Sequence, residues 1–101
     1  MSFFRVILIF LASLNISNTF SNDFIQNIRL SDNNNNKITR IVLDLSEKLP
    51  YTAFILNNKP RLVIDIEASG YTGKSIKNSK LVRSIRFRKT EKGVIRIVFD
   101  L

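Results

Sequence analysis

The sequence contains no cysteine and no histidine among its 101 residues. Without cysteine the chain can form neither a disulfide nor a thiolate metal site, and it cannot carry a lipoprotein anchor, which is attached to a cysteine. Without histidine it lacks the commonest general base near neutral pH and the commonest ligand of catalytic zinc. These absences exclude Ser-His-Asp and Cys-His catalysis and nearly all zinc hydrolysis within this chain. We therefore expect no metal, no cofactor and no enzymatic activity.

Acidic residues are also scarce. Lys and Arg number 16 against 8 Asp and Glu, which leaves a net charge of +8. Such a balance favours anionic partners: nucleic acid, anionic lipid head groups or acidic cell-wall polymers. A solvated basic surface with no particular partner is the alternative. The length allows at most one domain.

The N-terminus lacks an apolar run long enough for a membrane span. One positive charge, the apolar run 6–14 and a polar exit form the three-part pattern of a secretory signal. Thr19 and Ser21 are the small residues at positions −3 and −1 of a cut after Ser21. The apolar run has about half of the ~20 residues that a transmembrane helix needs, so we expect no stable membrane span. The pattern predicts a signal peptide at 1–21, a mature domain at 22–101 and a periplasmic location; the alternatives are an uncleaved anchor and a buried N-terminal helix.

Beyond Phe24 the apolar residues alternate with polar ones instead of following a helical period. Ile41, Leu43 and Leu45, for example, share one face of an extended segment. Period-two alternation of Ile, Val, Leu and Phe is typical of half-buried strands. The runs with this pattern are 28–30, 40–45, 52–56, 61–66, 81–88 and 94–101.

Turn-forming residues separate these runs. Asp32 and the asparagine run at 33–36 suit a hairpin loop, because Asp and Asn adopt left-handed conformations at low cost; a slack insert without a structural role is the alternative. Residues 57–60 predict a tight reversal with proline just before a strand. Gly70 and Gly73 bracket a longer polar link, and Gly93 closes the last hairpin.

An internal repeat organises the chain. Residues 40–45, 61–66 and 96–101 share the order Arg, aliphatic, Val, apolar, Asp, aliphatic, and 24–30 resembles 81–87. The chain thus contains two related hairpins, which predicts two similar antiparallel sheets. Packed face to face, they make an all-β fold, a small β-sandwich.

The repeated Arg and Asp residues allow two interpretations. Within one strand Arg40 and Asp44 lie about 13 Å apart at ~3.3 Å per residue, too far to pair. On antiparallel neighbours of the same pattern Arg would face Asp and help to set the register. The alternative is ligand contact, which the excess of basic residues favours for the arginines. The candidate ligand-binding residues, all predicted on outward faces, are Arg29, Arg40, Arg61, Arg86, Arg88 and Arg96.

The ordered series of motifs resembles the AMIN domain, the N-terminal module of periplasmic N-acetylmuramoyl-L-alanine amidases that is also found in pilus secretins. The stretches that carry the likeness are 27–29 (Asn-Ile-Arg), 39–46 (Thr-Arg-Ile-Val-Leu-Asp-Leu-Ser), 50–51 (Pro-Tyr), 54–58 (Phe-Ile-Leu-Asn-Asn), 60–65 (Pro-Arg-Leu-Val-Ile-Asp), 82–86 (Val-Arg-Ser-Ile-Arg) and 96–101 (Arg-Ile-Val-Phe-Asp-Leu). The resemblance implies a two-sheet β-sandwich that binds peptidoglycan and directs an amidase to the division septum. In that family hydrolysis belongs to a separate zinc domain, of which this sequence contains nothing.

Two alternatives accompany this prediction: the front part of a zinc amidase without its catalytic domain, and an assembly module of a secretin-like complex, with divisome or secretin components as partners. The second repeat ends at Leu101 without a counterpart to 46–56, so we expect a sandwich truncated by a strand or two, with an exposed edge. Export argues against a nucleic-acid partner. The aromatic residues also lack the spacing of a base-stacking platform, and we expect most of them in the core: Tyr51, Phe54, Tyr71 and Phe87.

Overall fold

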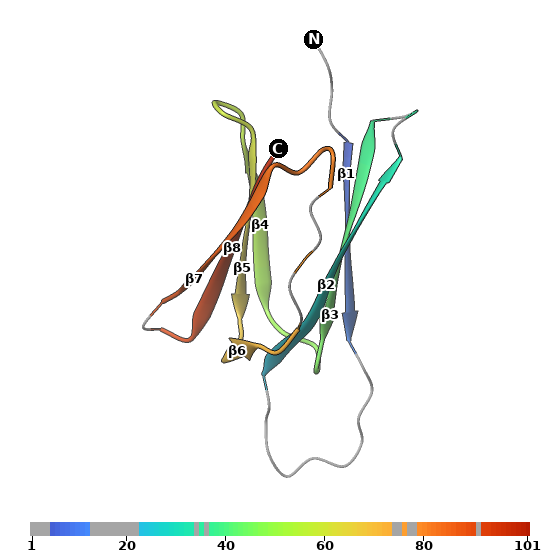
Figure 1. Ribbon diagram of the computed structural model, residues 1–101. Helices are drawn as coiled ribbons and strands as arrows, with labels where there is room; N and C mark the ends of the chain where they lie inside the picture. The colour runs from blue at the N-terminus through green and yellow to red at the C-terminus, as the bar shows by residue number, and fades with distance from the viewer. Residues whose placement is uncertain are drawn as a thin grey trace.

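The computed structural model describes residues 5–12, 23–33, 35, 37–73, 76, 79–90 and 92–101. In this part of the chain all regular elements are β-strands. They are β1 (Arg5–Ala12), β2 (Phe24–Asn33), β3 (Ile38–Leu45), β4 (Tyr51–Leu56), β5 (Arg61–Glu67), β6 (Gly70–Tyr71), β7 (Ser84–Lys89) and β8 (Val94–Asp100). Sheet A has the order β1-β3-β2-β6 and sheet B the order β4-β5-β8-β7. The two sheets face each other as the layers of a sandwich (Figure 1), which confirms the predicted all-β fold.

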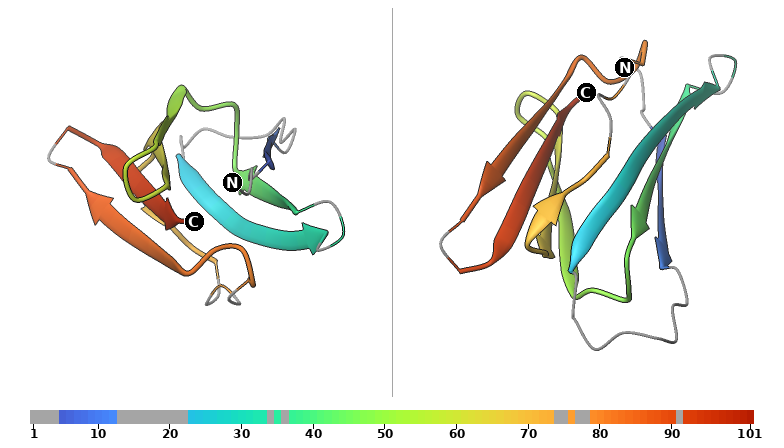
Figure 2. Two further views of the ribbon diagram at one scale, coloured as in Figure 1. Left: turned by 90° about the horizontal axis from the view of Figure 1, so that it is seen from above. Right: turned by 60° about the horizontal axis from the view of Figure 1, so that its bottom comes forward.

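The two related hairpins lie in different sheets, as the repeat predicts. β2 pairs antiparallel with β3 in sheet A, and β7 pairs antiparallel with β8 in sheet B. Their registers correspond: Asn27 lies opposite Asp44 in the first hairpin, as its counterpart Ser84 lies opposite Asp100 in the second. The sandwich therefore repeats one hairpin twice, with the two copies on opposite layers (Figure 2).

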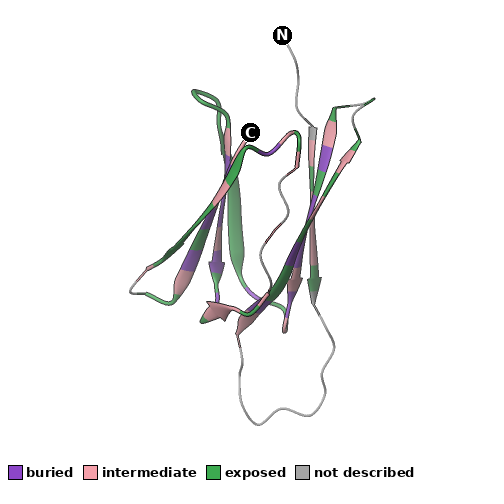
Figure 3. Cartoon of the chain, viewed as in Figure 1, coloured by how far each residue is buried: buried purple, intermediate pink, exposed green. Residues whose placement is uncertain are grey.

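The core lies between the sheets, on the faces that alternation assigns to it. Each central strand turns every second residue inward, and the buried residues gather there (Figure 3). The inward residues of β3, β5 and β8 are Ile41, Leu43, Leu45, Leu62, Ile64, Ile66, Ile95, Ile97 and Phe99. Fully burying a side chain of this size contributes about 1.5–3 kcal/mol, so these strands supply most of the stabilisation of a domain that has no disulfide.

Stacked aromatic pairs close both sides of the sandwich. At one side Phe10 of β1 stacks on Tyr51 of β4, with ring centroids 3.8 Å apart. At the other side Tyr71 of β6 stacks on Phe87 of β7 at 5.2 Å. The edge strands of sheet A therefore lie over the edge strands of sheet B: β1 over β4, and β6 over β7.

The expectation for the aromatic residues is wrong in three of four cases. Tyr51, Phe54 and Phe87 are 50, 41 and 44 % exposed. Tyr51 and Phe87 face inward but lie on β4 and β7, which have a neighbouring strand on one side only, whereas Phe54 lies on the outward face of β4. Tyr71 is half-buried against the core.

The described residues confirm the predicted breaks between strands. The reversal at 57–60 is observed, with Pro60 directly before β5. Among the described residues of the 32–38 loop and of this reversal, Lys37 and Lys59 have positive φ, 52° and 56°. Gly93, with φ 74°, closes the β7–β8 hairpin as expected. The link bracketed by Gly70 and Gly73 begins with the short strand β6, which the sequence did not predict.

The apolar part of the predicted signal peptide forms β1, which pairs parallel with β3. The alternative of an N-terminal helix is therefore wrong for Arg5–Ala12. The cut after Ser21 lies outside the described residues, and cleavage stays a prediction. In the described part of the chain no helix is long and apolar enough to cross a membrane.

Candidate binding face

The repeated Arg and Asp residues meet across strands, as the sheet interpretation predicts. β5 runs antiparallel to β8, which sets Asp65 opposite Arg96 and Arg61 opposite Asp100. The guanidinium of Arg96 donates two hydrogen bonds to Asp65, Nε to Oδ1 at 2.8 Å and Nη2 to Oδ2 at 2.9 Å. These bonds hold the pKa of the Asp65 carboxyl below its ordinary value.

The two hairpins share a second kind of ion pair, which runs diagonally between their strands. Arg29 of β2 donates to Asp44 of β3, from Nε at 3.0 Å and from Nη2 at 2.9 Å. Its counterpart Arg86 of β7 donates from Nη2 to Asp100 of β8 at 3.1 Å. The hydroxyl of Ser84 also donates to Asp100, and these donors lower the pKa of that carboxyl, Ser84 more than Arg86.

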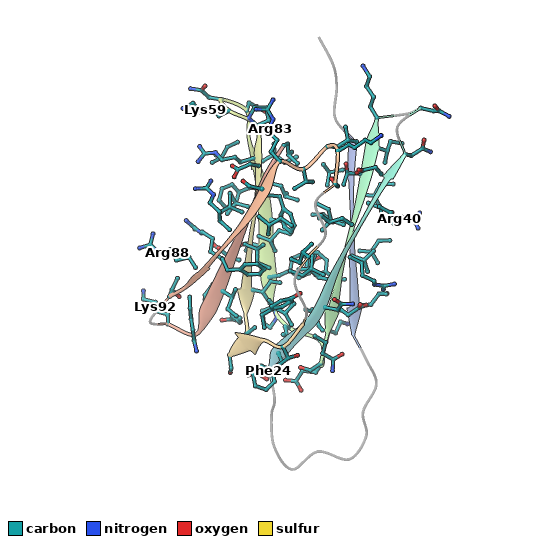
Figure 4. All side chains as sticks on the ribbon, viewed as in Figure 1. Phe24, Arg40, Lys59, Arg83, Arg88 and Lys92 are labelled. Atoms are coloured by element: carbon teal, nitrogen blue, oxygen red, sulfur yellow. The ribbon has the colours of Figure 1, made fainter. Side chains whose placement is uncertain are left out.

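The six candidate arginines do not form one site, because they lie on opposite outer faces of the sandwich. Arg29 and Arg40 lie on the outer face of sheet A, on β2 and β3. The other four lie on the outer face of sheet B, which we call the arginine face: Arg61, Arg86, Arg88 and Arg96. The side chains of Arg40 and Arg88 point away from the core in opposite directions (Figure 4).

The candidates also differ in what they bind within the chain. Arg29, Arg86 and Arg96 each pair with an aspartate, although their side chains keep 45–59 % of their surface exposed. Arg61 is half-buried opposite Asp100, and its Nε has no hydrogen-bond partner. Neither Arg40 nor Arg88 forms an ion pair with a residue in the described ranges. Arg29, Arg86 and Arg96 therefore stabilise the pairing of strands. Arg40 and Arg88 keep their guanidinium donors available for a ligand.

On the arginine face, Arg88 of β7 lies directly opposite Arg96 of β8. Like charges at opposite positions destabilise a sheet, and Asp65 neutralises only Arg96. The pair therefore has one unmatched positive charge at the exposed edge of sheet B. The guanidinium of Arg88 therefore keeps two parallel N–H donors for a carboxylate.

An apolar strip crosses the same face beside these arginines. Phe54, Val63, Val98 and Arg86 occupy one row across β4, β5, β8 and β7. Phe54 is 41 % exposed at the start of this row. The sequence analysis missed Phe54 as a surface residue. Alternation along β4 gave the signal, because Ala53 and Ile55 face inward and the residue between them must face outward.

A hollow of about 400 Å³ lies at one end of the arginine face, lined by Pro50, Tyr51, Thr52, Asp65, Glu67 and Val94. Its two carboxylates would repel an anion, so an anionic group is expected across the sheet from the hollow, beside Arg88 at the β7 edge. Within the described ranges no three His, Cys, Asp or Glu side chains gather in a way that could hold a metal ion.

Comparison with known families agrees with the architecture. The family model described as the AMIN domain matches residues 27–101, which spans the sequence from β2 to the end of β8. A search of the curated proteins finds no match.

Proposed function

The chain belongs to the AMIN domain family, and from this premise we propose that it is a non-catalytic module that binds peptidoglycan in the periplasm. AMIN domains are non-catalytic modules associated with peptidoglycan in periplasmic proteins. A net charge of +8 agrees with an acidic polymer as the partner. The observation that carries the proposal is the unmatched charge of Arg88 beside Arg96 on an open sheet face.

We assign the wall-binding surface to the arginine face. Peptidoglycan stem peptides carry carboxylates, and the guanidinium of Arg88, which has no ion pair in the described ranges, can bind one through two parallel hydrogen bonds. Charge-assisted bonds of this kind contribute about 1.5–3 kcal/mol each. The exposed ring of Phe54 on the same face offers an apolar contact for the less polar parts of the same ligand. The outer face of sheet A is a weaker choice, because Arg29, the other candidate on that face, is engaged by Asp44.

Export and targeting complete the proposal. The leader at 1–21 would direct export to the periplasm and would then be removed. There the module would hold a partner at the septal wall. Hydrolysis of the wall would then belong to a separate domain or protein of the N-acetylmuramoyl-L-alanine amidase kind. An assembly role beside secretin components is the second candidate, and it would use strand edges more than the arginine face.

Co-sedimentation of the exported protein with purified sacculi tests the site. We expect Arg88→Glu to weaken binding about tenfold or more, because it removes one donor group and repels the carboxylate. Arg40→Glu is the matched control: it makes the same charge change at another exposed arginine that lacks an ion pair, on the opposite face. Binding should also fall between about 0.15 and 1 M salt, as screening increases. Equal loss in both variants would assign binding to net charge alone, and no binding by the parent protein would overturn the proposal.

A further inference from the structure

β4 is an open edge of sheet B, and its main chain presents hydrogen-bonding groups along that edge. The N–H of Glu67 in β5 donates to the carbonyl of Pro50 at 3.0 Å, which identifies the hydrogen-bonded pairs between β4 and β5. In an antiparallel ladder such pairs alternate with non-bonded ones. The N–H and C=O groups of Tyr51, Ala53 and Ile55 therefore point away from β5. In the described part of the chain no strand pairs with β4 on that side.

The other edge of sheet B is protected against further pairing, whereas β4 is not. β7 carries Arg86 and Arg88 on its outer face and Lys89 on its inner face. Charged residues on an edge strand, inward-pointing ones included, prevent the addition of another strand. β4 has the uncharged sequence Tyr-Thr-Ala-Phe-Ile-Leu, and all six residues are exposed (Figure 3). An edge of this composition favours strand addition.

We propose that β4 is a self-association edge, at which two copies of this chain join antiparallel about a twofold axis through Ala53. In this register Ala53 lies opposite its own copy, and Tyr51 lies opposite Ile55 of the second copy. It is the twofold register that pairs all three residues whose N–H and C=O groups point outward. On the inner face the ring of Tyr51 would cover Ile55 of the second copy. On the outer face Phe54 would lie opposite Thr52 of the second copy.

A second copy fits this edge better than a lipid surface does. In lipid the outward N–H and C=O groups of β4 would stay unpaired, which is costly, whereas a second copy pairs them. Sheet A does not block the approach, because its edge strand β1 lies over β4, as the stack of Phe10 on Tyr51 shows. The three cations of β7 lie at the far edge of each sheet B, so they would not face each other. An interface of one strand is small, and the dimer should therefore dissociate on dilution.

The dimer would double the arginine face. The joined sheet would have the order β7-β8-β5-β4, followed by the same strands of the second copy in reverse. Both outer faces would lie on the same side, with one Arg88 near each end. At ~4.8 Å per strand the two Arg88 residues would be roughly 30–35 Å apart. A dimer could then bind one wall polymer at two points and gain affinity without a new contact. This gain rests on the proposed wall binding, whereas the dimer itself does not.

Cross-linking through a single introduced cysteine tests the register, because the chain has no cysteine of its own. In a hydrogen-bonded antiparallel pair the Cα atoms lie about 5.5 Å apart, which suits a disulfide. We expect the exported protein with Ala53→Cys to form a disulfide-linked dimer under mild oxidation. Thr52→Cys is the matched control: it is equally exposed on β4, but it would lie diagonal to its own copy at about 7–8 Å. It should cross-link at least about tenfold more slowly.

A charge exchange at the same position gives a second, reversible readout by sedimentation velocity. Ala53→Lys and Ala53→Glu each place like charges opposite each other at the axis, so each variant alone should dimerise about tenfold more weakly than the parent. An equimolar mixture of the two variants should restore the dimer, because opposite charges then meet. Asn58→Lys and Asn58→Glu are the controls. They make the same charge changes in the β4–β5 turn, far from the axis, and each should dimerise like the parent.

The possible results separate the alternatives. A parent protein that stays monomeric up to about 1 mM, equal cross-linking of both cysteine variants, or a mixture of Ala53→Lys and Ala53→Glu that stays monomeric would overturn the proposal. A monomeric protein that binds vesicles of anionic lipid, and loses that binding with Ala53→Glu, would assign the edge to a membrane surface and would overturn it too. Dimerisation is measured without cell wall, and sacculus binding depends on Arg88, so either result can fail without the other.

Discussion

Asp65 accepts two hydrogen bonds from Arg96, at 2.8 and 2.9 Å, across the central pair of strands in sheet B. Both residues belong to the repeated pattern, at its Asp and Arg positions, so one copy of the motif neutralises another. In the observed antiparallel register, the charged residues of β5 lie opposite those of β8, and the apolar inward residues of the two strands lie opposite each other as well. The repeat thus specifies strand pairing, and most of its charged residues are engaged in that role.

The lowered pKa values of Asp65 and Asp100 predict a loss of stability in acid. Both carboxyls titrate below their ordinary value in the folded state. Their contribution is therefore fully present above the unfolded Asp pKa of about 3.9 and is lost as the pH falls through the folded values. We expect the denaturant midpoint to fall between about pH 5 and pH 2.

The variant Asp65→Asn separates this effect from general acid unfolding. It removes one of the two titrating carboxyls, so its midpoint should be lower than that of the parent at neutral pH and should depend less on pH below about 4. The same pH dependence in both proteins would show that the Arg96–Asp65 pair contributes nothing measurable.

The β7–β8 turn should be sensitive to the backbone of Gly93. Its φ of 74° lies in the left-handed region, and a Cβ there would contact nothing within 4 Å. Gly93→Ala should therefore cost about 1–2 kcal/mol for conformational reasons alone, measured by urea unfolding. Lys59→Gly is the converse change at a φ of 56°. It should be neutral or stabilising, and destabilisation by both changes would contradict this assignment.

Core packing should distinguish inward isoleucines that share a sheet. Ile64 is fully buried in β5, whereas Ile55 of β4 is 55 % exposed. Ile64→Val should lower the free energy of unfolding by about 0.5–1.5 kcal/mol. Ile55→Val should change it by less than about 0.5 kcal/mol. Equal effects would mean that β4 is covered in solution by something that the described residues do not include.

Alternation and repetition were enough to predict the central strands. A residue such as Ile41 must face the core once its neighbours Arg40 and Val42 are assigned outward, and Asp65 must find an arginine on an antiparallel strand. These are properties of a short segment and of its nearest strand, so they can be read from the sequence.

The edges could not be predicted in this way. β6 has two residues, too few for a visible pattern. The exposure of Tyr51 and Phe87, which are paired with the inward residues Ile66 and Ile97, depends on which strands end a sheet, and this is a long-range property. The register of β2 on β3 shifts between Ile25 and Asn27, and no local motif announces this irregularity. The division of six arginines between two faces likewise requires the sheet order.

Signal cleavage should change the surroundings of Tyr51 in a measurable way. We expect the exported protein to begin at Asn22, as determined by intact mass. Ser21→Leu should keep the leader attached, because a large residue at position −1 is unsuited to cleavage. With β1 removed, Tyr51 loses its stack on Phe10, a contact that contributes about 0.5–1.5 kcal/mol. Tyr51→Ala should therefore destabilise the Ser21→Leu protein more than the cleaved one in urea unfolding. An exported protein that retains residues 1–21 would contradict the signal-peptide assignment, and β1 would then be a permanent strand of sheet A.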